Sequence, residues 1–280
     1  MIFCILVKKI TPLLTLWFVF IIVVIIWSLQ FIHVLSIVQN VDVNGGNISV
    51  NITELLTEAE KNLPALAPAT QLQEVMGELG GHIFYVTGTG KRMRYISLKP
   101  FENGSIIRIT PDGSAYEIIA EQPISPTSEL PSHLLMHNFL LSKGRNNKVV
   151  LHTHTTNLIA LSHSPKWLDS AYITRTLWSM IPESRVIVPK GVGIVPYELP
   201  GSMKLAYATI KQLEKHDVVL WEKHGLLAVG EDIIECFDAI DTMAKSADIY
   251  LNARTAGFEP LGMTDEQLNE LAIAFNLPMS

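Results

Sequence analysis

Two histidines separated by one residue, His152 and His154, directly follow the apolar run 149–151. Alternate residues of a β-strand point to the same side, so both imidazoles can face one ion. Imidazole nitrogen is a common zinc ligand, and three protein ligands leave a coordination position open for chemistry. Two unrelated surface histidines would give the same spacing, but the apolar run before them indicates a buried location. The pattern therefore predicts part of a metal site, and a third ligand must come from elsewhere in the chain.

The best-placed third ligand is His224, because it ends the largely apolar segment 217–224, which is expected to be a strand. Three imidazoles with an open position are typical of a catalytic zinc ion rather than a structural one. His152, His154 and His224 are therefore the predicted ligands of Zn²⁺. Other histidines lack such a placement and are expected to be helix-surface or core residues: His133, His137 and His163.

Two carboxylates, Glu129 and Glu183, lie beside prolines near expected helix starts. A carboxylate at such a position more often complements the helix dipole than acts as an acid or base, and from residue type alone that role is favoured. Two glycine-rich turns, at residues 44–47 and 87–90, could present backbone N–H groups to an anion. Neither matches a nucleotide-binding fingerprint, and either turn alone more often connects two strands.

The pattern of apolar and polar positions around these residues predicts an α/β domain in layers. The expected strands cover residues 41–43, 48–52, 82–86, 106–110, 116–120, 149–152, 185–188 and 217–221. The expected helices cover residues 54–80, interrupted by Pro64 and Pro68, then 129–143, 157–162, 203–215, 233–256 and a segment starting at Thr264. Strands and helices do not alternate strictly, which favours a sheet covered by helices over a barrel.

Composition limits the classes of function. The chain has 280 residues and a formal net charge of −6, and its lysines and arginines are scattered. A nucleic-acid-binding protein normally shows a basic stripe, so nucleic acid is not an expected partner. A phosphorylated small molecule is compatible with an acidic chain, because backbone N–H groups can bind phosphate. The two cysteines, Cys4 and Cys236, lie far apart in the sequence, which suits a reducing compartment.

The N-terminal segment differs from the rest of the chain. Residues 10–41 contain no Asp, Glu, Lys or Arg, and about 20 apolar residues suffice to cross a bilayer as a helix. Two lysines precede this stretch, and the positive-inside rule would then hold the N-terminus in the cytoplasm. Taken alone, residues 13–37 predict a membrane anchor. The chain is accordingly divided into an apolar segment, residues 1–42, and a globular domain, residues 43–280.

Seven short motifs occur in an order that resembles the zinc-dependent class II aldolase family, which also contains the adducin head domain. They are NGGNIS at 44–49, VTGTGK at 86–91, PTSELPSH at 126–133, LHTHTTNLIALSH at 151–163, LWSMIPES at 177–184, VPKGVGIVPYELPG at 188–201 and WEKHG at 221–225. Several motifs in one order are far more specific than any single motif. The resemblance runs from about residue 44 to the C-terminus. It implies that residues 43–280 are a catalytic domain with three α/β/α layers and a mainly antiparallel central sheet.

The resemblance also implies roles for individual residues. His152, His154 and His224 match the zinc ligands, and Glu129 matches the catalytic acid and base. Glu183 matches a second acid, which in the family works in the site of a neighbouring subunit. The positions that match phosphate-binding residues of the family are Asn44, Gly46, Asn47, Thr89, Gly90, Thr127 and Ser128. The implied assembly is a homotetramer, and the implied compartment is the cytoplasm, where sugar phosphates are made and kept.

Within the family, residues 177–201 favour the rhamnulose-1-phosphate aldolases. The implied aldehyde-lyase reaction cleaves L-rhamnulose 1-phosphate reversibly to dihydroxyacetone phosphate and L-lactaldehyde, with zinc as Lewis acid and Glu129 exchanging a proton. The alternatives are a fuculose-phosphate aldolase or a ribulose-phosphate 4-epimerase of the same family. A third alternative is a membrane-anchored, non-enzymatic module on this fold. Such a module need not keep the three histidines and the acid, all of which are present here.

The apolar segment conflicts with the implied enzyme. In the family, an amphipathic helix leads into the loop that starts at Asn44, whereas here residues 13–37 stand in that place. The predicted orientation of an anchor would also export an enzyme of sugar phosphates. Three hypotheses remain open: a real anchor, a wrong translation start or reading frame upstream of about residue 43, and a mostly buried helix. The second is favoured, because the family resemblance begins abruptly at the loop.

Overall fold

The computed structural model describes residues 45–120 and 122–279. The apolar strip at residues 13–37, expected from the sequence to be a membrane anchor, lies outside the described residues, and so does Asn44. Within the described part of the chain, no helix is long and apolar enough to cross a bilayer.

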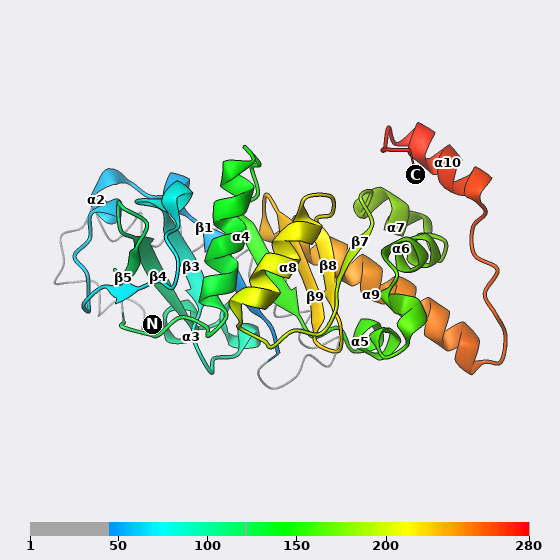
Figure 1. Cartoon of the computed structure of the whole chain (residues 1–280), viewed down its shortest axis with the longest axis horizontal. Helices are drawn as coiled ribbons and strands as arrows, with labels where there is room; N and C mark the ends of the chain where they lie inside the picture. The colour runs from blue at the N-terminus through cyan, green and yellow to red at the C-terminus, as the bar shows by residue number, and fades with distance from the viewer. Residues whose placement is uncertain (1–44, 121, 280) are drawn as a thin grey trace, which may run out of the picture.

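One mixed β-sheet of nine strands forms the centre of the described chain (Figure 1). In spatial order the strands are β2 (Thr70–Gln71), β5 (Ala115–Ile118), β4 (Gly104–Ile109), β3 (Ile83–Thr87), β1 (Asn47–Asn51), β6 (Val149–Thr153), β9 (Gly225–Gly230), β8 (Val218–Trp221) and β7 (Val192–Val195). Every neighbouring pair is antiparallel except β7 and β8, which are parallel. The expectation of a mainly antiparallel sheet is confirmed.

Helices cover both faces of the sheet and complete three layers. One face carries α4 (Leu130–Ser142) and α8 (Met203–Leu213), and the other carries α5 (Thr156–Ser162), α6 (Ser170–Trp178), α7 (Pro182–Ile187) and α9 (Ile233–Thr255). Figure 1 shows α4 and α8 side by side in front of the strands, with α9 running behind them. Successive residues of β6 serve the two layers in turn, as strand geometry requires. Val150 packs with α4 and α8, whereas Val149 and Leu151 pack with α9.

The remaining elements are short. They are α2 (Glu58–Lys61), α3 (Pro100–Asn103), α10 (Asp265–Ala274) and single 3-10 turns at Thr53–Leu55, Gly77–Leu79, Met93–Tyr95 and Pro165–Leu168. Helix α10 begins as the sequence predicts. The Thr264 side chain accepts from the backbone N–H of Gln267, and the Gln267 side chain accepts from the backbone N–H of Thr264. This reciprocal capping satisfies two of the N–H groups that the first turn leaves without helical partners.

Two predicted elements are wrong. Residues 54–80, predicted to be helical, form only α2, two 3-10 turns and β2. Pro64 and Pro68 prevent a continuous helix there, and the N–H of Leu66 donates to the carbonyl of Ile118 at the edge of the sheet. Residues 185–188, predicted to be a strand, lie mostly in α7, because Pro182 is well suited to the first turn of a helix. The sequence pattern also did not predict α6, β7 and β9.

Strand β1 joins the two halves of the sheet. It pairs with β3 on one side and with β6 on the other, and all five of its residues are buried. In the β1–β6 register, Asn47 lies opposite His152. The beginning of β1 therefore lies beside the end of β6, where the predicted metal ligands occur.

Candidate metal and catalytic site

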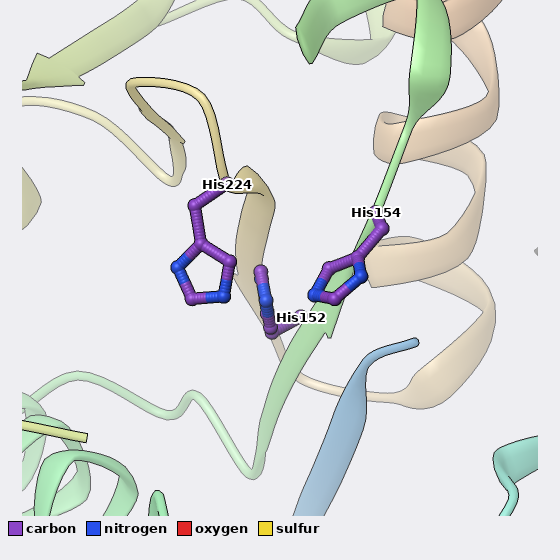
Figure 2. Close-up of side chains that lie close together, drawn as sticks. All are labelled: His152, His154 and His224. Atoms are coloured by element: carbon purple, nitrogen blue, oxygen red, sulfur yellow. The ribbon is translucent and has the colours of Figure 1, made fainter. Parts of the chain in front are cut away.

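Three imidazoles converge where β6 ends and β8 turns into β9 (Figure 2). The ring centroids lie 4.7 Å apart for His152 and His224, 5.1 Å for His152 and His154, and 5.2 Å for His154 and His224. The nitrogen atoms that could bind a metal lie within 4.8 Å of one another. His224 lies in the turn between β8 and β9, three residues after the end of the strand that the sequence predicts it to terminate. The structure brings the three predicted ligands together.

The ring of His152 is held in one orientation by its surroundings. Its Nδ1 lies 3.1 Å from the carbonyl oxygen of Leu226, to which it donates a hydrogen bond. One face of the ring packs on Trp221, with ring centroids 4.5 Å apart. Trp221 is fixed in turn, because its indole N–H donates to the hydroxyl of Thr209 in α8 at 2.9 Å. An imidazole that donates through Nδ1 keeps its lone pair on Nε2, so the hydrogen bond to Leu226 also selects the atom that can bind a metal.

The site favours neutral imidazoles. Burial lowers the pKa of His152 well below its usual value, and the neighbouring histidines lower it further. Burial and the nearby His154 lower the pKa of His224 to about 4. Nε2 of His152 and Nδ1 of His224 are buried and have no hydrogen-bond partner within the described residues. Neutral rings with unpartnered buried nitrogen atoms fit a divalent metal ion, because metal binding requires the unprotonated lone pair.

Two glycines allow the backbone to pass close to these histidines. A Cβ atom on Gly46, which has a φ of +85°, would lie 2.3 Å from the carbonyl oxygen of His152. A Cβ atom on Gly225 would lie 2.3 Å from the carbonyl oxygen of Thr153 and 2.9 Å from Cε1 of His152. Only glycine fits at either position without moving β6. The close packing at these two glycines thus fixes the end of β6, where His152 lies and which His154 directly follows.

Glu129 approaches the imidazoles from the residue before α4. Its carboxylate makes no hydrogen bond to the first turn of the helix. Oε2 instead accepts a hydrogen bond from Nδ2 of Asn47 at 3.0 Å, and Oε1 lies 3.8 Å from Nε2 of His224. The residue is only 8 % exposed, and burial raises the pKa of its carboxyl group, although the hydrogen bond from Asn47 partly opposes that effect. A buried carboxyl of raised pKa beside a cluster of imidazoles is suited to accept and return a proton.

A cavity of about 170 Å³ opens beside these groups. Among the residues that line it are Glu129, His154, His224 and all the described residues predicted to bind phosphate: Gly46, Asn47, Thr89, Gly90, Thr127 and Ser128. Two backbone hydrogen bonds join the segment that contains Thr87 and Thr89 to the segment that contains Thr127, and both segments line the cavity. They run from Thr127 to Thr87 at 2.7 Å and from Thr89 to Ser125 at 2.9 Å.

Three further residues of the VTGTGK motif line the cavity, and the sequence pattern assigns no role to any of them individually. Thr87, Gly88 and Lys91 line it, and Lys91 is the one lysine or arginine among its described lining residues. Its place at the end of the VTGTGK motif was the available signal, because a lysine after a glycine-rich turn can approach the same anion. A cation at this position suits a negatively charged ligand.

Glu183 lies away from this cavity. It is exposed in the first turn of α7 and does not line the cavity. His133 and His137, which the sequence assigns to a helix surface or a core, are fully buried in α4. His163 follows α5 and is exposed. Of the two predicted acids, the structure therefore brings only Glu129 to the three imidazoles within one chain.

Comparison with known protein families identifies the class of protein to which this fold and site belong. The pattern of the family described as "Class II Aldolase and Adducin N-terminal domain" matches residues 36–251, and this chain belongs to that family. Nine strands with helices on both faces agree with this membership.

Two curated relatives share a more specific name. The rhamnulose-1-phosphate aldolase of Bacteroides thetaiotaomicron is 50 % identical over 235 residues, which cover 84 % of this chain and 87 % of that protein. The enzyme of the same name from Enterococcus faecalis is 36 % identical over 241 residues, covering 84 % of each chain. Among solved structures, a sugar-phosphate aldolase from Thermotoga maritima is 29 % identical with a TM-score of 0.71, covering 84 % of this chain and 98 % of that one.

Proposed function

We propose that this chain is an aldehyde-lyase that cleaves L-rhamnulose 1-phosphate reversibly to dihydroxyacetone phosphate and L-lactaldehyde. The observation that carries the proposal is the cluster of three imidazoles, two of which line one cavity together with a buried carboxylate and two glycine-rich loops. The choice of substrate is supported by 50 % identity to a relative named rhamnulose-1-phosphate aldolase. A solved structure named L-fuculose 1-phosphate aldolase shares the fold at 20 % identity and a TM-score of 0.57, which supports no shared substrate.

His152, His154 and His224 would hold the metal, which we propose to be zinc. Three neutral imidazoles suit that ion and leave a coordination position open to a ligand. When bound, the ion would supply a Lewis acid that stabilises the negative charge left on the dihydroxyacetone phosphate half after the C3–C4 bond breaks. The hydrogen bond from Nδ1 of His152 to the carbonyl oxygen of Leu226 and the contact of its ring with Trp221 keep this imidazole oriented before any ligand arrives.

Glu129 would move the proton. Its Oε2 is occupied by the amide of Asn47, so Oε1, on the side of His224, is the oxygen available to the substrate. In cleavage, the C4 hydroxyl would lose its proton to solvent as it becomes the carbonyl of lactaldehyde, and Oε1 would deliver a proton to C3. In synthesis, Oε1 would remove that proton from C3, and the new C4 oxygen would take one up from solvent. A carboxyl group of raised pKa can serve in both directions near neutral pH.

The glycine-rich loops would bind the phosphate group. The proposed donors are backbone N–H groups at Gly46, Asn47, Gly90 and Ser128 and the hydroxyls of Thr89, Thr127 and Ser128, with Asn44 beyond the described residues. The backbone N–H groups of Thr89 and Thr127 are already bound to Ser125 and Thr87. Lys91 would add a positive charge at the same end of the cavity. Holding the phosphate fixes the distance between the reacting carbon and Glu129, and such positioning can contribute several kcal/mol to catalysis.

Further proposals concern the assembly. Glu183, exposed on α7, would act as an acid in the site of a neighbouring subunit of a homotetramer. Residues 43–280 would form the catalytic domain, with the cytoplasm as its compartment. Cross-linking and sedimentation would test the tetramer. Complementation between inactive Glu183→Gln and Glu129→Gln subunits in mixed tetramers would test a site shared between chains.

A cleavage assay tests the proposed function. L-rhamnulose 1-phosphate, L-fuculose 1-phosphate and L-ribulose 5-phosphate are incubated with the purified protein, and dihydroxyacetone phosphate is measured through an NADH-linked reductase. The rhamnulose substrate should be cleaved with the highest kcat/KM, and a chelator should abolish turnover until zinc is returned. Equal or better turnover of another substrate would overturn the substrate assignment, and chelator-insensitive cleavage would overturn the metal mechanism.

A further inference from the structure

A chain of buried polar side chains extends from Glu129 through Asn47 into the layer between β1 and α4. Ser49 in β1 contacts two histidines of α4: its Oγ lies 2.7 Å from Nδ1 of His133 and 2.9 Å from Nε2 of His137. Nε2 of His133 lies 2.5 Å from Oδ1 of Asn47, and Asn47 donates to Glu129. Positions 133 and 137 are four residues apart, so both rings face β1 from one side of the helix. The five side chains form one connected network.

The network has only one consistent direction of donation. A carboxylate only accepts, so Asn47 must present its amide N–H to Glu129 and its amide oxygen to His133. His133 must then donate through Nε2, which leaves Nδ1 as an acceptor. The hydroxyl of Ser49 donates to that Nδ1, and its oxygen accepts the N–H of His137. Each hydrogen bond thus fixes the polarity of the next one, starting at the carboxylate of Glu129 and ending at His137.

The members of the network behind the carboxylate carry no charge. His133 is 0 % exposed and His137 is 1 % exposed, and burial lowers the pKa of each to about 3. Both rings are therefore neutral at neutral pH, and each has one donor and one acceptor nitrogen. A neutral His133 can either donate or accept at Nε2, and the amide oxygen of Asn47 requires the donor. The hydroxyl of Ser49 then supplies the hydrogen bond that the unprotonated Nδ1 needs. The backbone of α4 alone would permit both tautomers of His133.

We propose that His133, whose Nε2–H tautomer is completed by a hydrogen bond from Ser49 to Nδ1, is a positioning residue that fixes the amide of Asn47 and thereby the carboxylate of Glu129. If His133 accepted at Nε2, Asn47 would turn its amide group over and face the carboxylate with its oxygen. Two acceptors would then oppose each other, and Glu129 would leave the place from which Oε1 reaches the cavity. The proposal rests on the proposed function only in treating Glu129 as the proton-transfer group.

The physical cost of the network supports a role beyond packing. Ser49, His133 and His137 are buried beside apolar residues of the same sheet face, such as Phe84 and Val86. Buried polar groups destabilise a core unless every one is hydrogen-bonded, whereas apolar residues of similar volume carry no such requirement. What the polar groups add is a single orientation of the last member of the chain. That last member is the carboxylate beside the imidazoles.

Two pairs of variants test this role by steady-state kinetics. Ser49→Ala removes the hydroxyl that donates to Nδ1 of His133, and Ser105→Ala is its matched control. Ser105 lies on the same face of the sheet, two strands away, and is 1 % exposed, with an Oγ that has no partner within the described residues. His133→Leu removes the donor to Asn47, and His133→Gln can restore a donor at nearly the same place.

Misplacing a catalytic group by about 1 Å can reduce a rate by about 100-fold. We expect kcat to fall about tenfold in Ser49→Ala and about 100-fold in His133→Leu, with KM and zinc content unchanged. His133→Gln should recover at least part of the loss, and Ser105→Ala should retain wild-type kcat. A wild-type kcat in folded Ser49→Ala, or an equal loss in Ser105→Ala, would overturn the proposal. If His133→Leu does not fold, the two serine variants still decide it.

Two measurements test the network without any turnover. Solid-state ¹⁵N NMR of histidine-labelled protein should show a neutral ring protonated at Nε2, and that signal should disappear in His133→Gln. In a crystal structure of Ser49→Ala, the carboxylate of Glu129 should have left Asn47. The opposite tautomer, a charged ring or an unmoved carboxylate would contradict the inference. These results stand even if the wild-type protein does not cleave rhamnulose 1-phosphate, in which case the proposed function fails separately.

Discussion

Replacing Glu129 with glutamine separates proton transfer from metal binding. Glutamine has nearly the same shape as glutamate, and its amide oxygen can take the place of Oε2 as acceptor for Asn47. The residue is 8 % exposed, and the change removes a carboxyl group whose charged form is disfavoured by burial. We therefore expect the free energy of unfolding to change by no more than about 1 kcal/mol, the net contribution of a typical hydrogen bond.

The expected loss of rate is much larger. General acid–base catalysis by one positioned side chain contributes about 10²- to 10⁴-fold, which corresponds to about 3 to 5 kcal/mol in the activation barrier. Glutamine cannot exchange a proton at neutral pH, so that whole contribution should disappear from kcat. The three imidazoles are unchanged, and only they form a group that could hold a metal within the described residues. Zinc content should therefore stay at the wild-type value.

The assay compares kcat, KM, zinc content and unfolding free energy in one set of preparations. Glu214→Gln provides the control, because Glu214 is exposed at the end of α8, away from the cavity. Dihydroxyacetone phosphate release measures turnover, and mass spectrometry measures the metal. If Glu129→Gln keeps more than a tenth of the wild-type kcat, the assignment of the proton-transfer group is refuted. If it loses its zinc, the carboxylate contributes to metal binding and the separation of roles is wrong.

Three further predictions concern the metal, the close backbone contact and the pH dependence of stability. His154→Ala should lose both zinc and activity, as metal analysis of the purified protein will show. Gly46→Ala should destabilise the fold by at least about 1 to 3 kcal/mol in urea denaturation, because its Cβ would meet the carbonyl oxygen of His152. The pKa values of His133 and His137 are about 3 in the fold and about 6.5 in the unfolded chain. The unfolded chain therefore binds more protons below pH 6.5, so stability falls as the pH decreases towards 3. His137→Leu should reduce the loss of unfolding free energy between pH 7 and pH 5 by about 2 kcal/mol.

Much of the fold follows from regular patterns in the sequence. The apolar run before His152 predicts β6, and the capping pair at Thr264 predicts the start of α10. Predictions fail where two principles compete. The apolar residues after Glu183 fit a short strand, but Pro182 favours a helix start, and the local signal prevails. The polar composition of residues 54–80 suggests a helix, but prolines and contacts with the sheet edge prevent it.

The site could be predicted only in part, for a physical reason. His152 lies in β6 and His154 directly follows its end, so the alternation of an extended chain alone places them together. Glu129 and Asn47 are 82 residues apart and meet only through the packing of α4 on β1. The contacts of His133 with Ser49 depend on the same long-range packing, and the four-residue spacing to His137 was their only signal. Local periodicity identifies candidates, but it does not state which of them meet.

The central place of β1 has a consequence for the order of folding. Without β1, the sheet would separate into β2–β5–β4–β3 and β6–β9–β8–β7, and no other described strand pairs one half with the other. The site lies at this junction, since Asn47 comes from β1 and His152 from β6. During synthesis, β1 leaves the ribosome about 100 residues before β6, and closing such a loop makes this pairing slow. The metal site should therefore be among the last parts to form, and hydrogen exchange during refolding should protect β3 and β4 before the amides that join β1 to β6.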